Sequence, residues 1–117
     1  MKLFDSELRV MDLLWDRGSM RASDIAKKLG EDIGWNKNTT YTVIKKCLAK
    51  GAIERKDPGF ICTAKLSREK VQQQETKELI RKLFKNSKRD FLAAFFETEE
   101  IGDTDRKELL RFIEEQK

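Results

Sequence analysis

One stretch of this chain constrains the fold more than any other, because it reads as a short helix with two different sides. Residues 35–50 have the sequence WNKNTTYTVIKKCLAK. At about 100° per residue, one side of this helix collects a mostly apolar group: Thr40, Val43, Ile44, Cys47 and Leu48. The opposite side collects small and polar residues: Asn38, Thr42, Lys45, Lys46 and Ala49. The segment therefore predicts a helix that packs on a core with its first side and is exposed on its second.

The exposed side of this helix has a chemistry that suits DNA. It offers ammonium, amide and hydroxyl groups for phosphates and base edges, and it lacks carboxylates that would repel a polyanion. The basic excess of the chain also lies here, since residues 35–66 hold seven basic and two acidic residues, whereas residues 1–34 hold six and seven and residues 67–117 twelve and twelve. We expect DNA contacts from this helix at Lys37, Asn38, Thr39, Tyr41, Thr42, Lys45 and Lys46.

Two further helical patterns precede this segment. The first is expected to begin at Asp5 or Ser6, either of which can cap exposed amides, and to end at Gly18. The second has apolar residues at positions 22, 25, 26 and 29 and is expected to end at Gly30, before a loop over residues 31–37. With a third helix that ends at Gly51, this order predicts a helix-turn-helix core.

The residues after Gly51 predict a β-hairpin. Residues 52–55 read as a strand, KDPG at 56–59 is a strong turn, and FICTA at 60–64 has the β-branched and aromatic content of a returning strand. This hairpin would be the wing of a winged helix. Arg55 and Lys56 are expected near its tip, where they would contact a flanking phosphate.

Residues 67–117 predict a helical tail. Ser67 and Ser87 are expected to cap two helices, and Asp103 or Thr104 to start a third. The apolar stripes of these helices are too extensive for a tail of this size to bury alone, so we expect a homodimer with two-fold symmetry. Such a dimer also presents two DNA-reading helices to the two half-sites of an operator. We thus expect a DNA-binding domain at 1–66 and a dimerisation domain at 67–117. The candidate dimer contacts are Val71, Leu79, Ile80, Leu83, Phe84, Phe91, Phe95, Leu109, Leu110, Phe112 and Ile113.

The composition argues against other classes of protein. The chain has no histidine, and its two cysteines, Cys47 and Cys62, do not form a Cys-x-x-Cys motif, so we expect neither a metal site nor a cofactor. No nucleophile with a base and no phosphate-binding loop is recognisable, which argues against an enzyme. No apolar run approaches the length of a membrane span, and residues 1–7 lack the apolar stretch of a signal peptide, so we expect a cytoplasmic protein.

Four stretches together resemble one family: SELRVMDLLW at 6–15, ASDIAKKL at 22–29, the third helix through to GAI at 53, and FICTA at 60–64. They resemble the penicillinase repressor family, which includes the repressors of β-lactamase and methicillin-resistance genes and the copper-responsive CopY type. The resemblance covers nearly the whole chain. It implies a winged helix with a helical dimerisation tail, mainly α with a small β-hairpin, and repression from a dyad-symmetric operator in double-stranded DNA.

The resemblance also has consequences for regulation and specificity. Tyr41 and Lys46 stand where members commonly place Arg or other residues, and Phe60 and Cys62 replace two wing tyrosines, so the operator sequence is expected to differ. The Cys-x-Cys pairs of the copper branch are absent from the C-terminal end, which argues against a CopY-type metal switch. In β-lactam-responsive members a protease cuts the tail next to a Phe. By alignment, the resemblance implies a cleavage site at Ala94 and Phe95 and a sensor protease as partner.

Several alternatives stay open at this level. Trp35 suits either the core or a platform beside DNA, and Thr39 suits either a helix cap or a phosphate contact, whereas Thr40 is expected to pack. A ligand, rather than cleavage, would also account for derepression. The main alternative function is a winged-helix adaptor that binds protein without sequence-specific DNA binding.

Overall fold

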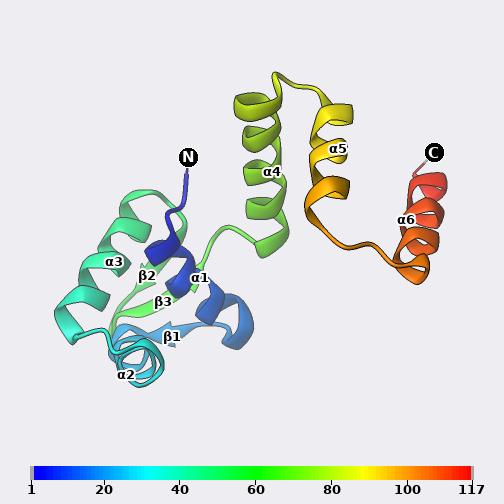
Figure 1. Ribbon diagram of the computed structural model, residues 1–117. Helices are drawn as coiled ribbons and strands as arrows, with labels where there is room; N and C mark the ends of the chain where they lie inside the picture. The colour runs from blue at the N-terminus through cyan, green and yellow to red at the C-terminus, as the bar shows by residue number, and fades with distance from the viewer. Residues whose placement is uncertain (1, 117) are drawn as a thin grey trace. The chain divides into compact units, whose positions relative to one another are not determined.

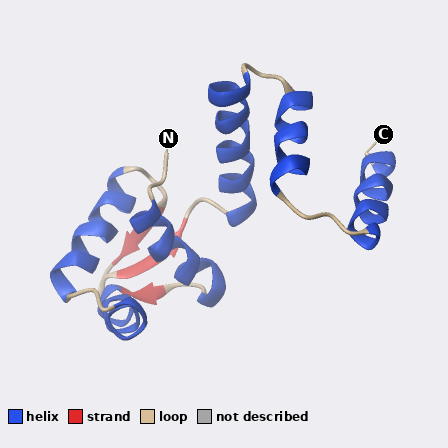
Figure 2. Cartoon of the chain, viewed as in Figure 1, coloured by secondary structure: helices blue, strands red, loops and turns tan. Residues whose placement is uncertain are grey.

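The computed structural model describes residues 2–116, which form two compact units that divide between Glu75 and Thr76. Figure 1 shows the course of the backbone through both units. The elements follow one another as α1 (Asp5–Arg17), β1 (Met20–Arg21), α2 (Ala22–Ile33), α3 (Lys37–Ala49), β2 (Ile53–Lys56), β3 (Ile61–Ala64), α4 (Arg68–Phe84), α5 (Lys88–Thr98) and α6 (Asp103–Glu115). Helix predominates and all the strands lie in the first unit, as predicted (Figure 2).

The sheet of the first unit has three antiparallel strands in the order β1-β3-β2. β2 and β3 form the predicted hairpin, in which Arg55 lies opposite Cys62. β1 was not expected, because two residues show no strand periodicity. It pairs with the far side of β3, where Met20 lies opposite Cys62. This pairing ties the wing to the start of α2, so the hairpin does not project from the core as an isolated element.

The core of the first unit is built from one side of each of its first three helices and from the hairpin. The helical periodicity predicted most of these positions, and side chains from all these elements are fully buried. The largest of them are Glu7, Val10, Met11, Ile25, Thr40, Ile44, Cys47, Ile53 and Cys62. Trp15 of α1 packs against this core, and its indole N–H donates to the Leu66 carbonyl at 2.8 Å.

The ends of the first helices differ from the prediction in detail. α1 begins at Asp5, but neither Asp5 nor Ser6 caps it; the Glu7 carboxylate instead accepts from the Phe4 N–H at 2.7 Å. α2 continues past Gly30 to Ile33 and ends where Gly34 adopts a left-handed conformation at φ 73°. The expected loop over residues 31–37 therefore shrinks to residues 34–36, and the turn between α2 and α3 is tight.

The tail helices begin where the sequence indicated. The Ser67 hydroxyl accepts from the Lys70 N–H and the Ser87 hydroxyl accepts from the Asp90 N–H, both at 3.0 Å, and α6 begins at Asp103. α4 ends at Phe84. No helix among residues 2–116 combines the length and the apolar character that a membrane span requires.

Val71 corrects the expected assignment of the tail. It was predicted to be a dimer contact, but its side chain is buried within the core of the first unit. Arg68, three residues earlier, pairs with Asp16 at 2.8 Å and with Asp12 at 3.7 Å, both on α1. The start of α4 thus belongs to the first unit, because Val71 lies in the core of that unit and Arg68 pairs with α1.

Candidate nucleic-acid interface

The helix α3 is oriented by its buried side. Asn36 caps it by accepting from the Thr39 N–H at 2.8 Å, so the cap considered for Thr39 is supplied three residues earlier. Thr40, Val43, Ile44 and Cys47 are buried, as the periodicity predicted. The Thr39 side chain is exposed, which is compatible with the alternative considered for it, a phosphate contact.

The opposite side of α3 is open to solvent. Every residue assigned to it from the sequence is exposed, and α3 contains no acidic residue. These residues are Asn38, Thr42, Lys45, Lys46 and Ala49. The Thr42 hydroxyl donates to the Asn38 carbonyl one turn earlier at 2.9 Å, which fixes the orientation of this exposed side chain and leaves its hydroxyl oxygen able to accept. The surface thus presents two ammonium groups and oriented polar groups, the combination that phosphates and base edges require.

Tyr41 and Trp35 lie beside this surface. Tyr41 is half-buried and its ring meets the Phe60 ring of the wing edge to face, with centroids 5.9 Å apart. Lys37, one turn before Tyr41, holds its ammonium 5.8 Å from the centre of the tyrosine ring. Trp35 packs partly against the core, so the core interpretation of this residue is the one the contacts favour.

The two basic residues of the wing lie on different faces of β2. Side chains alternate along a strand, so Arg55 shares the face of buried Ile53, whereas Lys56 shares the face of exposed Glu54. Arg55 is also engaged within the wing, because its Nε donates to both carboxylate oxygens of Asp57, at 3.1 and 3.2 Å. The sequence predicted the same role for Arg55 and Lys56, but their side chains leave β2 on opposite faces.

Arg21 is a basic residue that the sequence reasoning did not single out. It is exposed on β1, opposite Ile61 of the wing, and its guanidinium lies next to Gly59 in the turn. Only the unexpected pairing of β1 with β3 brings it there. A search for basic residues just before a predicted second helix would have found it.

The end of α3 is fixed by a buried ion pair. The Lys50 ammonium lies 2.6 Å from the Glu7 carboxylate of α1, donates to the Lys2 carbonyl at 2.8 Å and lies 4.4 Å from the centre of the Phe4 ring. Burial alone would raise the pKa of Glu7, but hydrogen bonds from Lys50 and from the Phe4 N–H outweigh it and hold this pKa below its ordinary value. Lys50 therefore fixes α3 on α1 and is not part of the exposed basic surface.

The two cysteines are core residues. Burial raises the pKa of Cys47 to about 12 and also raises the pKa of Cys62, so both thiols stay protonated at neutral pH. A protonated, buried thiol is a weak nucleophile and a weak metal ligand. Within residues 2–116, His, Cys, Asp and Glu side chains form no group of three that would hold a metal ion.

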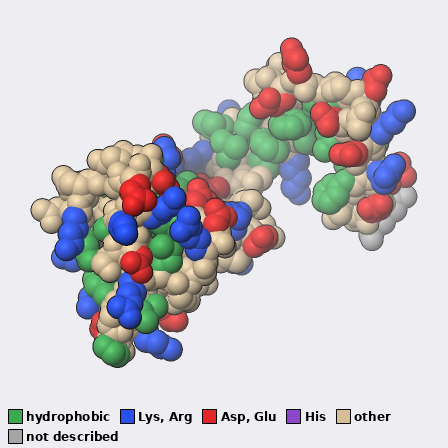
Figure 3. All heavy atoms as spheres, turned by 90° about the horizontal axis from the view of Figure 1, so that it is seen from below, with side chains coloured by type: hydrophobic (Ala, Val, Ile, Leu, Met, Phe, Trp, Pro, Cys, Tyr) green, Lys and Arg blue, Asp and Glu red, His purple; other side chains and the backbone are tan. Residues whose placement is uncertain are grey.

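The tail presents apolar side chains that the single chain leaves uncovered. No side chain in residues 76–116 is buried, and hydrophobic side chains are visible on the surface of the tail (Figure 3). The most exposed large ones are Leu79, Leu83, Leu92, Phe95, Phe96, Leu110, Phe112 and Ile113. The other predicted dimer contacts in this unit, Ile80, Phe84, Phe91 and Leu109, are half-buried. At the implied cleavage site, Ala94 is half-buried and Phe95 is 39% exposed in the single chain.

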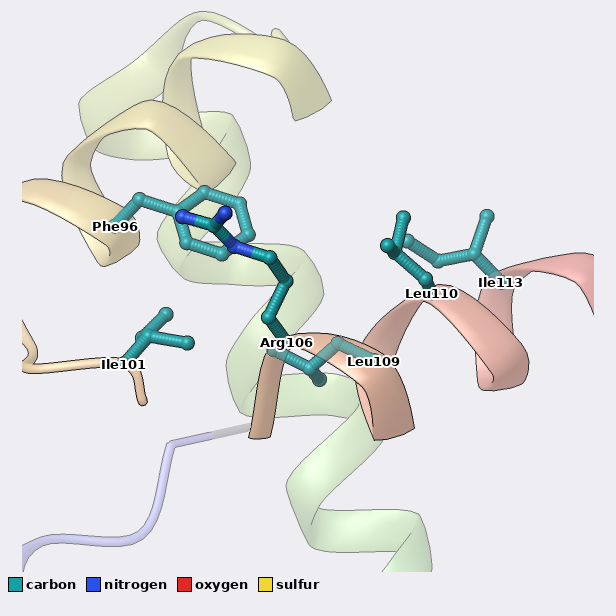
Figure 4. Close-up of a pocket in the computed structure, with 6 residues that line it drawn as sticks. All are labelled: Phe96, Ile101, Arg106, Leu109, Leu110 and Ile113. Carbon is teal, nitrogen blue, oxygen red and sulfur yellow. The ribbon is translucent and has the colours of Figure 1, made fainter. Parts of the chain in front are cut away.

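An apolar groove lies within the tail. It has a volume of about 450 Å³, and its walls come from α5, the following loop and α6 (Figure 4). The lining residues are Phe96, Ile101, Arg106, Leu109, Leu110 and Ile113. Three of them, Phe96, Leu110 and Ile113, also belong to the exposed apolar set, so the groove and the exposed face are continuous.

A three-helix core, a three-stranded sheet with a wing and an exposed, carboxylate-free third helix together define a winged helix-turn-helix domain. The comparisons with known proteins agree. The family model described as penicillinase repressor matches residues 3–115, and this chain belongs to that family. The penicillinase repressor of Bacillus licheniformis is 21% identical over 99% of this chain and 92% of its own length. The methicillin resistance regulatory protein MecI of Staphylococcus aureus is 22% identical over 96% of this chain and 93% of its own length.

A solved structure agrees with the fold of the first unit. The solution structure of the DNA binding domain of the repressor BlaI superposes with a TM-score of 0.55 and 25% sequence identity, covering 59% of this chain and 87% of that one. The resemblance inferred from the sequence is therefore confirmed for family and for fold. The family is named for repressors, which makes an enzyme an unfavourable interpretation.

Proposed function

We propose that this protein is a transcriptional repressor that binds a dyad-symmetric operator in double-stranded DNA as a homodimer, through α3 and the wing. The observation that carries the proposal is the exposed side of α3: amide, hydroxyl and ammonium groups without a carboxylate, on the element that reads the major groove in helix-turn-helix proteins. One relative is named as a repressor and another as a regulatory protein, and the solved structure is that of the DNA binding domain of a repressor, which supports the same function.

The DNA interface is tested by two substitutions on α3. Lys45→Ala removes an ammonium group that is expected to contact a phosphate, so the affinity for specific and for random duplexes should fall alike. The salt slope, which is the steepness of the fall of log affinity with log salt concentration, should decrease by about 1. Thr42→Ala should instead change base preference, by about 1 to 3 kcal/mol if its hydroxyl or methyl meets a base edge. Fluorescence anisotropy over a salt series measures both, with Lys77→Ala in the tail as the control.

The same measurement separates repressor from adaptor. A phosphate interface makes affinity fall steeply as salt rises, because condensed counterions are released on binding. DNA affinity that ignores salt, or unchanged affinity in both α3 variants, would favour the adaptor. Footprinting of the wild-type protein on DNA upstream of its own gene would then locate the operator.

The dimer is supported by the absence of any buried side chain in residues 76–116, which leaves the apolar face of the tail for a second copy to cover. A charged side chain placed in that face would lose its hydration when the second copy binds, so it should weaken the dimer. Leu83→Glu, at a side chain that is 70% exposed in the single chain, should therefore shift sedimentation from dimer to monomer. Lys82→Glu, at the neighbouring exposed position, is the matched control and should leave the dimer intact.

Derepression is proposed to follow from cleavage of the Ala94–Phe95 bond by a sensor protease. The bond lies inside α5, so a protease would need the helix to open locally before cutting. Cleavage would separate residues 95–117, and with them Phe112 and Ile113, from the DNA-binding domain. Two linked half-site contacts would then become independent, and the avidity lost is about 10²-fold or more. Mass spectrometry of the protein from induced cells decides between models, since full-length chain throughout derepression favours a ligand.

A further inference from the structure

Rings and cations from α3 and the wing form a continuous row. Lys37 lies 5.8 Å from the ring centre of Tyr41, the Tyr41 and Phe60 centroids are 5.9 Å apart, and the Arg55 guanidinium carbon lies 3.6 Å from the ring centre of Phe60. Phe60 is thus in contact with the helix on one side and with the wing arginine on the other. A contact of this kind transmits the position of one element to the other, because stacked rings and cations hold a preferred geometry.

The backbone fixes Phe60 in this place. Phe60 adopts a left-handed conformation with φ 49°, directly after Gly59 at φ 101°. A bulky residue in this region is strained and persists only where its surroundings hold it. Those surroundings include the Ala22 N–H at the start of α2, which donates to the Phe60 carbonyl at 2.9 Å. The backbone of Phe60 is therefore held from α2, while its ring contacts Tyr41 of α3.

Contacts within the wing fix the Arg55 side chain but leave its terminal amino groups available. Its Nε donates to Asp57, and its guanidinium plane is supported by the Phe60 ring. Of the five N–H donors of a guanidinium, this arrangement uses the one on Nε. Within residues 2–116, the terminal amino groups of Arg55 have no protein acceptor. Two parallel donors on a braced guanidinium are the geometry that binds phosphate oxygens in pairs.

Asp57 has no evident place on a DNA-facing surface unless it acts through Arg55. It is one of only two acidic residues in the basic stretch 35–66, and its charge opposes the approach of a polyanion. Its carboxylate nonetheless accepts from Arg55 with both oxygens. The geometry thus assigns it an orienting role.

We propose that Phe60 and Asp57 are positioning residues that aim the terminal amino groups of Arg55 at a DNA phosphate beside the bases that α3 reads. In this arrangement Tyr41 braces Phe60 from α3 and is not itself a DNA contact. The inference rests on the proposed function, since it concerns how the wing engages the same DNA. It also separates the two wing residues, because Lys56 lies on the opposite face of β2 and does not depend on Phe60.

A double-mutant cycle with operator DNA tests this dependence. Arg55→Ala should lower affinity about 10-fold and reduce the salt slope by about 1, the loss of one phosphate contact. Phe60→Leu should lower affinity several-fold with a similar loss of slope, although it removes no charge. The double variant should bind within about 2-fold of Arg55→Ala alone, because Phe60 acts through Arg55. Independent, additive losses would overturn the proposal.

Matched variants keep the test separate from general damage to the fold. Phe60→Trp retains a ring for stacking and should retain affinity and slope, and all binding is measured below the unfolding temperature of each variant. Lys56→Ala combined with Phe60→Leu should be additive, since the two side chains act independently. Coupling of Phe60 to Lys56 as strong as to Arg55 would show a merely structural role and overturn the assignment.

Asp57→Asn supplies a test with an opposite sign. In the Arg55→Ala background it should raise affinity, because it only removes a repulsive charge. With Arg55 present it should lower affinity or leave it unchanged, because the orienting hydrogen bonds are weakened. An equal rise in both backgrounds would overturn the role of Asp57. If Lys45→Ala weakens binding while the cycles are additive, the positioning fails but the DNA-binding function stands; unchanged binding in Lys45→Ala and Arg55→Ala together would overturn both.

Discussion

The two units of this chain solve the problem of burying apolar surface in opposite ways. The first contains a dense core in which Val10, Met11, Ile25 and Ile44 are completely inaccessible. The second, residues 76–116, contains no buried side chain, and Leu83 and Phe112 remain 70% and 59% exposed. The first is therefore stable through its own contacts, whereas the second has apolar side chains enough for a core but leaves them facing outward.

This contrast bears on how a repressor of this kind is inactivated. A domain with its own core keeps its DNA-reading surface whether or not a partner is present. A tail that depends on a second copy loses its structure and its linkage together. Regulation aimed at the tail, by cleavage or by a ligand, would thus change avidity while leaving each reading head folded.

The largest effect is expected from opening the core of the first unit. Ile44→Ala removes a fully buried side chain of α3 and should lower the free energy of unfolding by about 2–5 kcal/mol. Because this core lies within one chain, the loss should be the same at every protein concentration. Urea denaturation over a hundredfold range of concentration measures it.

The matched change in the tail is Leu83→Ala. Its side chain is 70% exposed in the single chain, so its effect should grow as the protein is concentrated into dimer and vanish on dilution. A large, concentration-independent loss from Leu83→Ala would contradict the contrast between the units.

A smaller effect, of about 1–3 kcal/mol, is expected from Glu7→Gln, which removes the charge that Lys50 meets in a buried place. The pKa of Glu7 is lowered in the folded state, so the stabilisation is fully present above its ordinary value of 4.5 and is lost as pH falls through the lower folded value. Wild-type stability should therefore decline below about pH 4.5, and that part of the decline should be absent from Glu7→Gln. Stability is measured by thermal unfolding as a function of pH. If the profiles of the wild-type protein and of Glu7→Gln ran parallel, the Glu7 carboxylate would not be responsible for the loss of stability at low pH. Glu31→Gln, at an exposed position on α2, is the control.

The parts of the fold that were predictable are those governed by periodicity and local capping. The stripe of α3, the wing turn, and the caps Ser67 and Ser87 follow from neighbours in the sequence, and the structure confirms them. The predicted end of α2 was wrong because Gly30 and Gly34 are both plausible C-terminal residues for this helix. Only Gly34 adopts the left-handed conformation, while the backbone of Gly30 stays helical near the Trp35 carbonyl.

The features that the sequence did not predict depend on contacts between distant segments. β1 exists only because β3 offers a free edge to Met20 and Arg21. The burial of Glu7 depends on Lys50, and the contact of Arg55 with Phe60 depends on the register of the hairpin. For the candidate DNA surface, periodicity predicted the exposed residues of α3. It did not predict that the Phe60 ring supports Arg55, whereas the Lys56 side chain has no hydrogen bond or ion pair within residues 2–116.

Val71 shows the same limit at the boundary between the units. Its place on an apolar stripe of α4 was consistent with either the core or a dimer face, and only tertiary packing assigns it to the core. The contact boundary between Glu75 and Thr76 lies inside α4, beyond the expected boundary at residue 66. A helix can continue through such a boundary because its backbone hydrogen bonds are local, while its side chains change partners.

The smallest expected effect concerns this boundary within α4. Arg68 pairs with Asp16 and Asp12 and lies 5.3 Å from the ring centre of Trp15, so it fastens the start of α4 to α1. Arg68→Ala should speed hydrogen exchange at the amides of residues 71–75 while leaving residues 80–84 unchanged, because the ion pairs act only on the first part of the helix. Since these charges are solvent-exposed, the difference should shrink at high salt. Arg81→Ala, which breaks the pair with Glu78 in the second part of α4, is the matched control and should show the reverse pattern. Equal acceleration along the whole of α4 in both variants would mean that the helix opens as one unit, and the boundary at Glu75 would then have no dynamic counterpart.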